Sequence, residues 1–194
     1  MVLKPTRAGF TKAAQLIRSG GVVAFPTDTV YGLGAAADDE VARRRIYHVK
    51  GRPVGLPLIL MVAARSQLEG WVHIDSRAET MMERWWPGPL TLILHAIGGG
   101  TLGVRIPKHK AALGLLSATG PLMTTSANLH GKDPAMTAQE AGSMPGVAAV
   151  LDGGVAPGGI ASTVLDLTGP EPHVLREGAI LKPELLGPPP LRSG

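Results

Sequence analysis

Short apolar runs of strand length alternate along this chain with segments whose apolar residues recur at helical spacing. The strongest runs are residues 22–25, 57–62 and 90–94, and unbroken apolar runs of this kind are typical of strands covered on both faces. Further strands are expected near 101–106, 121–125, 147–151, 162–167 and 173–176. Because helical segments separate many of these strands, the pattern predicts an α/β fold with helices packed on a twisted mixed sheet.

Helix signals stand beside most of these runs. We expect Thr11 to cap a helix that closes at Gly20, and Asp38 or Asp39 to cap a second helix that reaches Val49. The other helices are expected after a capping box at 76–79, at 109–118, and after a second capping box at 137–140.

The composition fits one domain with a good-sized core. The chain has 194 residues, of which 44% are hydrophobic, and its 26 glycines and 17 prolines predict a rim rich in tight turns. We divide it into a domain over residues 1–182 and a Pro/Gly-rich tail over residues 183–194.

Several protein classes are excluded by what the sequence lacks. It has no cysteine, so disulfides, thiolate nucleophiles and cysteine metal sites are ruled out. It has no run of about 18 apolar residues and no apolar N-terminal stretch, so we expect neither a membrane span nor a secretory signal, and a cytoplasmic protein is the simplest interpretation. The formal net charge of +4 favours anionic partners such as nucleotides or RNA.

Standard nucleotide and metal motifs are mostly missing. The glycines at 98–100 are not followed by the Lys-Ser/Thr ending of a P-loop. Residues 32–37 fit Gly-x-Gly-x-x-Ala, but this segment starts well after the strand ends, and no acidic residue follows at the distance needed for a ribose hydroxyl. The six histidines are scattered, which argues against a zinc site, and the sequence has no Gly-x-Ser-x-Gly elbow.

Polar and cationic side chains gather where the apolar runs end. Thr27, Asp28 and Thr29 follow the strand at 22–25, and residues 124–128 close the strand at 121–125 with polar side chains. Such positions are where the binding sites of α/β domains are built. We therefore expect these loops to contribute to a binding site.

Four basic residues are candidates for holding an anion. Lys50 and Arg52 can point to one rim if the chain is extended before Pro53, although two solvated cations would give the same pattern. Arg105 and Arg176 each stand within an apolar run, where an arginine is either a snorkelling edge residue or a buried anion ligand.

In order and spacing these segments resemble the YrdC-like family of L-threonylcarbamoyladenylate synthases, whose hallmark is Lys-x-Arg followed far downstream by Ser-x-Asn. The matching segments cover about residues 10–180 and are 26–34, 50–52, 86–91, 104–107, 126–128, 161–164 and 175–178. Two positions depart from the family pattern, because Asp28 stands where the family often has Glu, and Ala161 where Glu commonly precedes Ser-Thr.

The resemblance implies an open α/β domain with a concave basic site and a specific reaction. L-Threonine, bicarbonate or CO2, and ATP would give threonylcarbamoyl-AMP and pyrophosphate, for N6-threonylcarbamoyladenosine in tRNA, with tRNA threonylcarbamoyl-transfer proteins acting downstream. Mg2+ would accompany ATP, without a protein metal site or a prosthetic group. The residues implied are Lys50 and Arg52 for catalysis, Lys50, Arg52, Ser126, Asn128 and Arg176 for ATP, and Thr27, Arg105 and Ser162 for threonine.

Two other functions stay open. The positive charge also fits a protein that only binds tRNA or double-stranded RNA, whose affinity would fall steeply with salt. YrdC-like domains also occur in carbamoyltransferases that form carbamoyl-AMP from carbamoyl phosphate, so the resemblance includes this second enzyme class.

Overall fold

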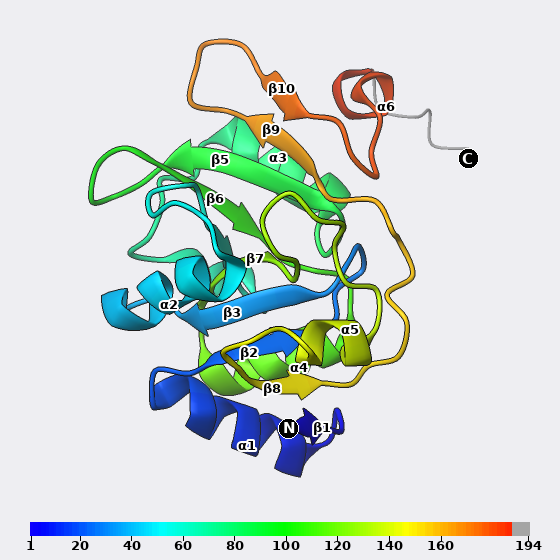
Figure 1. The fold of residues 1–194 in the computed structure, drawn as a ribbon. Coiled ribbons are helices and arrows are strands. Elements are labelled where there is room, and N and C mark those ends of the chain that lie inside the picture. The colour runs from blue at the N-terminus through cyan, green and yellow to red at the C-terminus, as the bar shows by residue number, and fades with distance from the viewer. Residues whose placement is uncertain (188–194) are drawn as a thin grey trace.

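The computed structural model describes residues 1–187, in which ten strands form one continuous mixed sheet (Figure 1). The strand order is β1-β8-β2-β3-β7-β4-β6-β5-β9-β10. The strands are β1 Val2–Leu3, β2 Val22–Phe25, β3 Gly32–Ala36, β4 Ile59–Met61, β5 Leu90–His95, β6 Thr101–Arg105, β7 Leu122–Ser126, β8 Val147–Leu151, β9 Thr163–Asp166 and β10 His173–Arg176. The helices are α1 Arg7–Arg18, α2 Glu40–Lys50, the 3-10 helix η1 Arg65–Leu68, α3 Ser76–Trp85, α4 Lys110–Thr119, α5 Ala138–Gly142 and α6 Lys182–Leu186. The predicted α/β fold with a mixed sheet is confirmed.

The register of the strands separates two faces of the sheet. Met123 lies beside Leu60, Leu60 beside Val104, and Val104 beside Leu92, so these side chains share one face. Helix α3 covers that face at these strands, and its apolar residues belong to the same hydrophobic cluster as the four side chains. Helices α2 and α5 cover the part of the face formed by β2, β3 and β8, where their apolar residues form a second cluster. Helices α1 and α4 cover part of the opposite face, over β2, β8 and β7.

The uncovered part of the second face carries polar side chains. Arg105 follows Val104 on β6, and neighbouring residues of a strand point to opposite faces, so Arg105 points away from α3. Arg176 on β10 lies beside Val164, which lies beside Thr91 on β5, and this row shares the face of Arg105. The fold thus leaves this part of the second face without a covering helix. We call it the polar strip, and it includes Thr91, Arg105 and Arg176.

Residues 32–36 form a strand that the apolar pattern does not predict. Gly32–Ala36 forms β3, which pairs antiparallel with both β2 and β7. A Cβ atom on Gly34 would lie 2.9 Å from the Phe25 ring and 3.1 Å from Leu122, so this glycine gives room for neighbouring side chains instead of a turn.

The helix caps were predicted with mixed success. Asp39 caps α2 by accepting from the Ala42 N–H at 2.9 Å, and the capping box at the start of α5 is present. The cap of α1 is Thr6 and not Thr11, whose hydroxyl instead donates back to a carbonyl inside the helix. Helix α3 is capped by Asp75 and not by the capping box predicted at 76–79. The Asp75 carboxylate, one position earlier, competes for the same N–H groups.

The end of the described chain is partly packed. Helix α6 begins at Lys182, the last residue of the domain that we predict, and extends into the segment that we separated as a tail, where its Leu185 is buried in the cluster that contains Leu92. The rest of that tail, residues 188–194, lies outside the described residues. Among residues 1–187, no helix is long and apolar enough to cross a membrane.

Leu92 tests the packing between α3 and the sheet. It is fully buried, and Leu92→Ala should lower the free energy of unfolding by roughly 2–5 kcal/mol through lost burial and the cavity left behind. Urea unfolding followed by circular dichroism would measure the change. Ile97→Ala, at a position 50% exposed, is the matched control and should change stability by less than about 0.5 kcal/mol. Equal losses for both variants would contradict the assignment of Leu92 to the core.

Candidate active site

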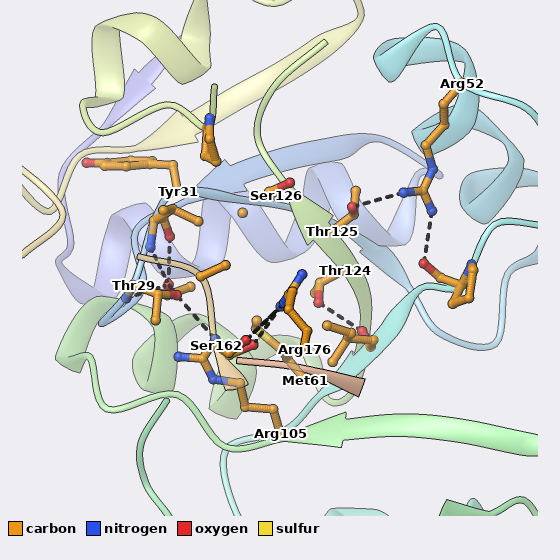
Figure 2. A pocket seen from close by; sticks show the side chains of 17 residues that line it. Thr29, Tyr31, Arg52, Met61, Arg105, Thr124, Thr125, Ser126, Ser162 and Arg176 are labelled. Atoms are coloured by element: carbon orange, nitrogen blue, oxygen red, sulfur yellow. Dashed lines mark hydrogen bonds between the residues drawn. The ribbon is translucent and has the colours of Figure 1, made fainter. Parts of the chain in front are cut away.

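A cavity of about 310 Å³ opens on the polar strip of the sheet (Figure 2). Its walls include the loop after β2, parts of β3, β4, β6 and β7, the loop after α2, the segment that enters β9, and the end of β10. Its polar lining includes hydroxyl and guanidinium side chains: Thr27, Thr29, Arg52, Arg105, Ser126, Ser162 and Arg176. Segments far apart in sequence therefore meet at one site.

The loop after β2 is held by its own hydroxyl groups. The Thr27 hydroxyl donates to the Val30 carbonyl at 2.6 Å and accepts from the N–H groups of Thr29 and Val30. Because its proton is directed to Val30, the 2.9 Å contact between the Thr27 and Thr29 hydroxyls is best formed with Thr29 as the donor. Thr27 thus stabilises the turn, while Thr29 remains the hydroxyl closer to Arg105.

Arg105 is a buried cation fixed at three points. Its Nε donates to the Gly88 carbonyl at 3.0 Å, its Nη1 to the Thr29 hydroxyl at 3.2 Å, and its Nη2 to Asp28 at 2.6 Å. The residue is only 2% exposed, which lowers its pKa, and the Asp28 carboxylate opposes that effect. A guanidinium carries five N–H groups, so two are left without an acceptor in residues 1–187. The snorkelling interpretation of Arg105 is wrong.

A second arginine stands on the same wall. Arg176 donates through Nε and Nη2 to the Ser162 carbonyl at 3.1 and 2.8 Å, and the Ser162 hydroxyl lies 2.9 Å from that of Thr91. Burial lowers the pKa of Arg176, and its charge also contributes to lowering the pKa of Arg105. Two cations on one wall make this side of the cavity attractive to an anion.

A third arginine, Arg52, also lines the cavity. Its Nη2 donates to the carbonyls of Leu56 and Pro57, both at 3.0 Å, and its Nη1 lies 3.4 Å from the Thr125 hydroxyl. The guanidinium also packs over the Tyr47 ring, 5.0 Å from its centre. Its buried Nε has no acceptor among the described residues. Arg52 therefore has an N–H group that no acceptor among the described residues occupies.

Lys50 and Asn128 lie behind the cavity wall. Among the described residues, the cavity lining includes Arg52 and Ser126 but neither Lys50 nor Asn128, so the structure does not place Lys50 and Arg52 on one rim. The Lys50 ammonium instead donates to oxygen atoms of Ser126 and Asn128. Burial, with a smaller effect of the Arg52 charge, lowers the pKa of Lys50 to about 8.

The lining offers little to a resident metal ion. In residues 1–187, no group of three or more His, Asp or Glu side chains could hold one. The Asp28 carboxylate, which approaches the site from the loop after β2, is engaged by Arg105 and by the Lys108 N–H. The donor set of the cavity is thus cations and hydroxyls, which suits anionic ligands.

Sequence reasoning missed Thr29. It lies two residues after Thr27 in the same loop, and both hydroxyls follow the strand end. The sequence pattern therefore marks both threonines as candidates but does not indicate which of them lies closer to a ligand. The hydrogen bond to Arg105 comes from β6, 76 residues away along the chain, and it distinguishes Thr29 from Thr27.

The chain matches a known family over most of its length. The family model Sua5_yciO_yrdC, described as "Telomere recombination", matches residues 15–178. The chain therefore belongs to this family.

Relatives and solved structures agree with that assignment. Threonylcarbamoyl-AMP synthase of Pyrococcus abyssi is 44% identical over 181 residues, which are 87% of this chain and 53% of that protein. The crystal structure of P. abyssi Sua5 complexed with L-threonine superposes with a TM-score of 0.91 at 37% identity, covering 96% of this chain and 61% of that one. The crystal structure of E. coli YciO superposes with a TM-score of 0.81 at 30% identity, covering 92% and 94%. This chain spans about half the length of the P. abyssi synthase.

The lowered pKa of Lys50 predicts a pH effect on stability. Between pH about 8 and 10.5, an unfolded chain keeps the Lys50 proton that the folded chain has lost, so the free energy of unfolding gains a contribution that rises with pH in this window. The difference between wild type and Lys50→Met should therefore shift in favour of wild type from pH 7.5 to 9.5. Urea unfolding of both proteins at the two pH values would measure it. A constant difference would show that the hydrogen bonds of the ammonium keep its pKa near the ordinary value.

Proposed function

We propose that this protein is an L-threonylcarbamoyladenylate synthase, which forms threonylcarbamoyl-AMP and pyrophosphate from L-threonine, bicarbonate or CO2, and ATP. The observation that carries the proposal is that one cavity is lined by three arginines and a serine: Arg52, Arg105, Arg176 and Ser126. Such a cavity can hold two negatively charged substrates side by side. The identity to the P. abyssi synthase supports this activity.

The threonine subsite is proposed around Arg105. Its two remaining N–H groups suit the two oxygens of an amino-acid carboxylate, since a guanidinium is a planar fork. Ser162 and the loop of Thr27 supply hydroxyls beside it, and Thr29 offers a lone pair that its bonds to Thr27 and Arg105 leave open. That P. abyssi Sua5 was solved in complex with L-threonine supports L-threonine as the ligand of the proposed subsite.

The nucleotide subsite is proposed on the side of Arg52, with Lys50, Ser126, Asn128 and Arg176. In the reaction, the threonine amine bonds to the carbon of CO2, which bicarbonate supplies by releasing hydroxide, and the nitrogen loses one proton to solvent. A carbamate oxygen then attacks the α-phosphorus of ATP. The bond from that phosphorus to the bridging oxygen breaks, and pyrophosphate leaves with its electron pair. Mg2+ bound to the triphosphate would neutralise part of the charge of the leaving group.

This chemistry needs alignment and charge compensation more than a covalent nucleophile. Arg105 fixed at three points would hold the carboxylate, and with it the carbamate, at a set distance from the phosphates. Arg52 and Arg176 would stabilise the negative charge that develops around the α-phosphorus and the leaving oxygen. The product would be used by tRNA threonylcarbamoyl-transfer proteins.

Pyrophosphate release tests the proposed function. Release from ATP should require both L-threonine and bicarbonate, and the nucleotide product should contain the threonylcarbamoyl group by mass spectrometry. Release that is supported by carbamoyl phosphate in place of both would identify the carbamoyl-AMP-forming reaction. RNA binding that falls steeply with salt, with no pyrophosphate release, would instead support the RNA-binding function.

Arg105→Lys tests the threonine subsite. The variant keeps the charge but loses the planar fork, and hydrogen bonds to charged groups contribute roughly 1.5–3 kcal/mol each. The apparent affinity for threonine should fall about tenfold or more, with little change in ATP affinity measured without threonine. Threonine titrations at fixed ATP would measure this, with Arg18→Lys, an exposed position, as the control. Superimposable curves for Arg105→Lys and wild type would remove Arg105 from the site.

A further inference from the structure

Lys50 is held in place by the end of α2. The helix ends there because Gly51 takes the left-handed conformation, with φ of 59°. The Lys50 carbonyl accepts from the His130 N–H at 2.9 Å, and the residue is only 3% exposed. The helix before Lys50 and the hydrogen bond from His130 thus fix the backbone of Lys50, and with it the place from which its side chain extends.

The ammonium of Lys50 uses all its donors inside the protein. Nζ donates to the Ser126 carbonyl at 2.6 Å, to the Asn128 carbonyl at 2.8 Å and to Asn128 Oδ1 at 2.8 Å. A lysine ammonium has three N–H groups. A phosphate could reach Nζ only by displacing one of these three oxygens.

Asn128 completes the same cluster. Its Oδ1 also accepts from the Ser126 hydroxyl at 2.6 Å, and its amide nitrogen donates to the carbonyls of Leu129 and Lys132 at 3.0 and 2.7 Å. Both polar ends of this side chain are thus occupied. Of the three residues Lys50, Ser126 and Asn128, only Ser126 lines the cavity.

We infer that Lys50 is a positioning residue that shapes the nucleotide subsite by holding Ser126–Asn128, without touching the phosphates. The inference rests on the proposed function for the identity of the ligand. Its physical reason is that two carbonyls and an amide oxygen converge on one buried point, where only a cation with three donors satisfies them all. Without that cation, buried acceptors lose their partner and the segment must rearrange.

The test compares ligands with and without phosphates. For Lys50→Met, the affinities for ATP and for adenosine should fall by the same factor, about tenfold, because the damaged segment serves the nucleoside and the phosphates alike. Arg52→Met is the reference for a direct phosphate contact and should lose more ATP affinity than adenosine affinity. Lys132→Met removes an equal charge from an exposed position in the neighbouring loop and should leave both affinities unchanged. Calorimetry with each ligand gives the factors.

Hydrogen exchange gives a second readout that needs no ligand. The amides of Ala127 and His130 donate to the Tyr31 and Lys50 carbonyls, and both should exchange faster in Lys50→Met than in wild type or Lys132→Met. If Lys50→Met does not fold, Lys50→Arg takes its place, since a planar fork cannot direct three N–H groups at these three oxygens but could still bind a phosphate.

The outcomes separate the inference from the proposed function. A loss for ATP that is several times larger than the loss for adenosine, with unchanged exchange at Ala127 and His130, would overturn the positioning role. Failure of wild type to bind ATP would refute the proposed function, while the exchange rates would still decide whether Lys50 holds the segment.

Discussion

The candidate site depends on the burial of Arg105. A guanidinium that is cut off from water must be compensated by the protein, and the compensation here comes from two segments, with Asp28 and Thr29 after β2 and Gly88 before β5. These partners fix the loop, the strand and the cation relative to one another. Arg105 therefore organises the site before any ligand arrives.

A second buried cation, Lys50, organises the part of the site at the end of β7. Lys50 ties the end of α2 to the end of β7, so a helix and a strand that are 76 residues apart share one polar cluster. The two cations differ in what they leave free. Arg105 keeps two N–H groups without acceptors in the described residues, whereas the hydrogen bonds of Lys50 use its full set. Equal formal charge thus gives one residue suited to contact a ligand and another suited to hold a loop.

Saturation of hydrogen bonds, more than residue type, distinguishes the remaining site residues. Thr27 and Asn128 use their polar groups to stabilise turns, while Thr29 and Ser126 retain lone pairs at the cavity. In each loop the two polar residues stand two positions apart: Thr27 and Thr29 in the first, and Ser126 and Asn128 in the second. Function is therefore divided between neighbours that a sequence motif treats as equivalent.

The sequence by itself determined the elements, the family and the neighbourhood of the site. Apolar runs gave most strands because burial on both faces requires them, and the ordered motifs gave the family because they combine rare residue types at set spacing. Arg105, Ser162 and Arg176 were predicted as site residues, and they lie together on one wall of the cavity.

Only the tertiary structure decided which polar groups remain free. The strand at Gly32–Ala36 was missed because its glycines serve Phe25 and Leu122, which are distant in sequence or on another strand. The separate positions of Lys50 and Arg52 follow from the end of α2 between them and from acceptors on β7. Hydrogen-bond partners far apart in sequence set these roles, and a local pattern of residues contains no record of which partners will meet.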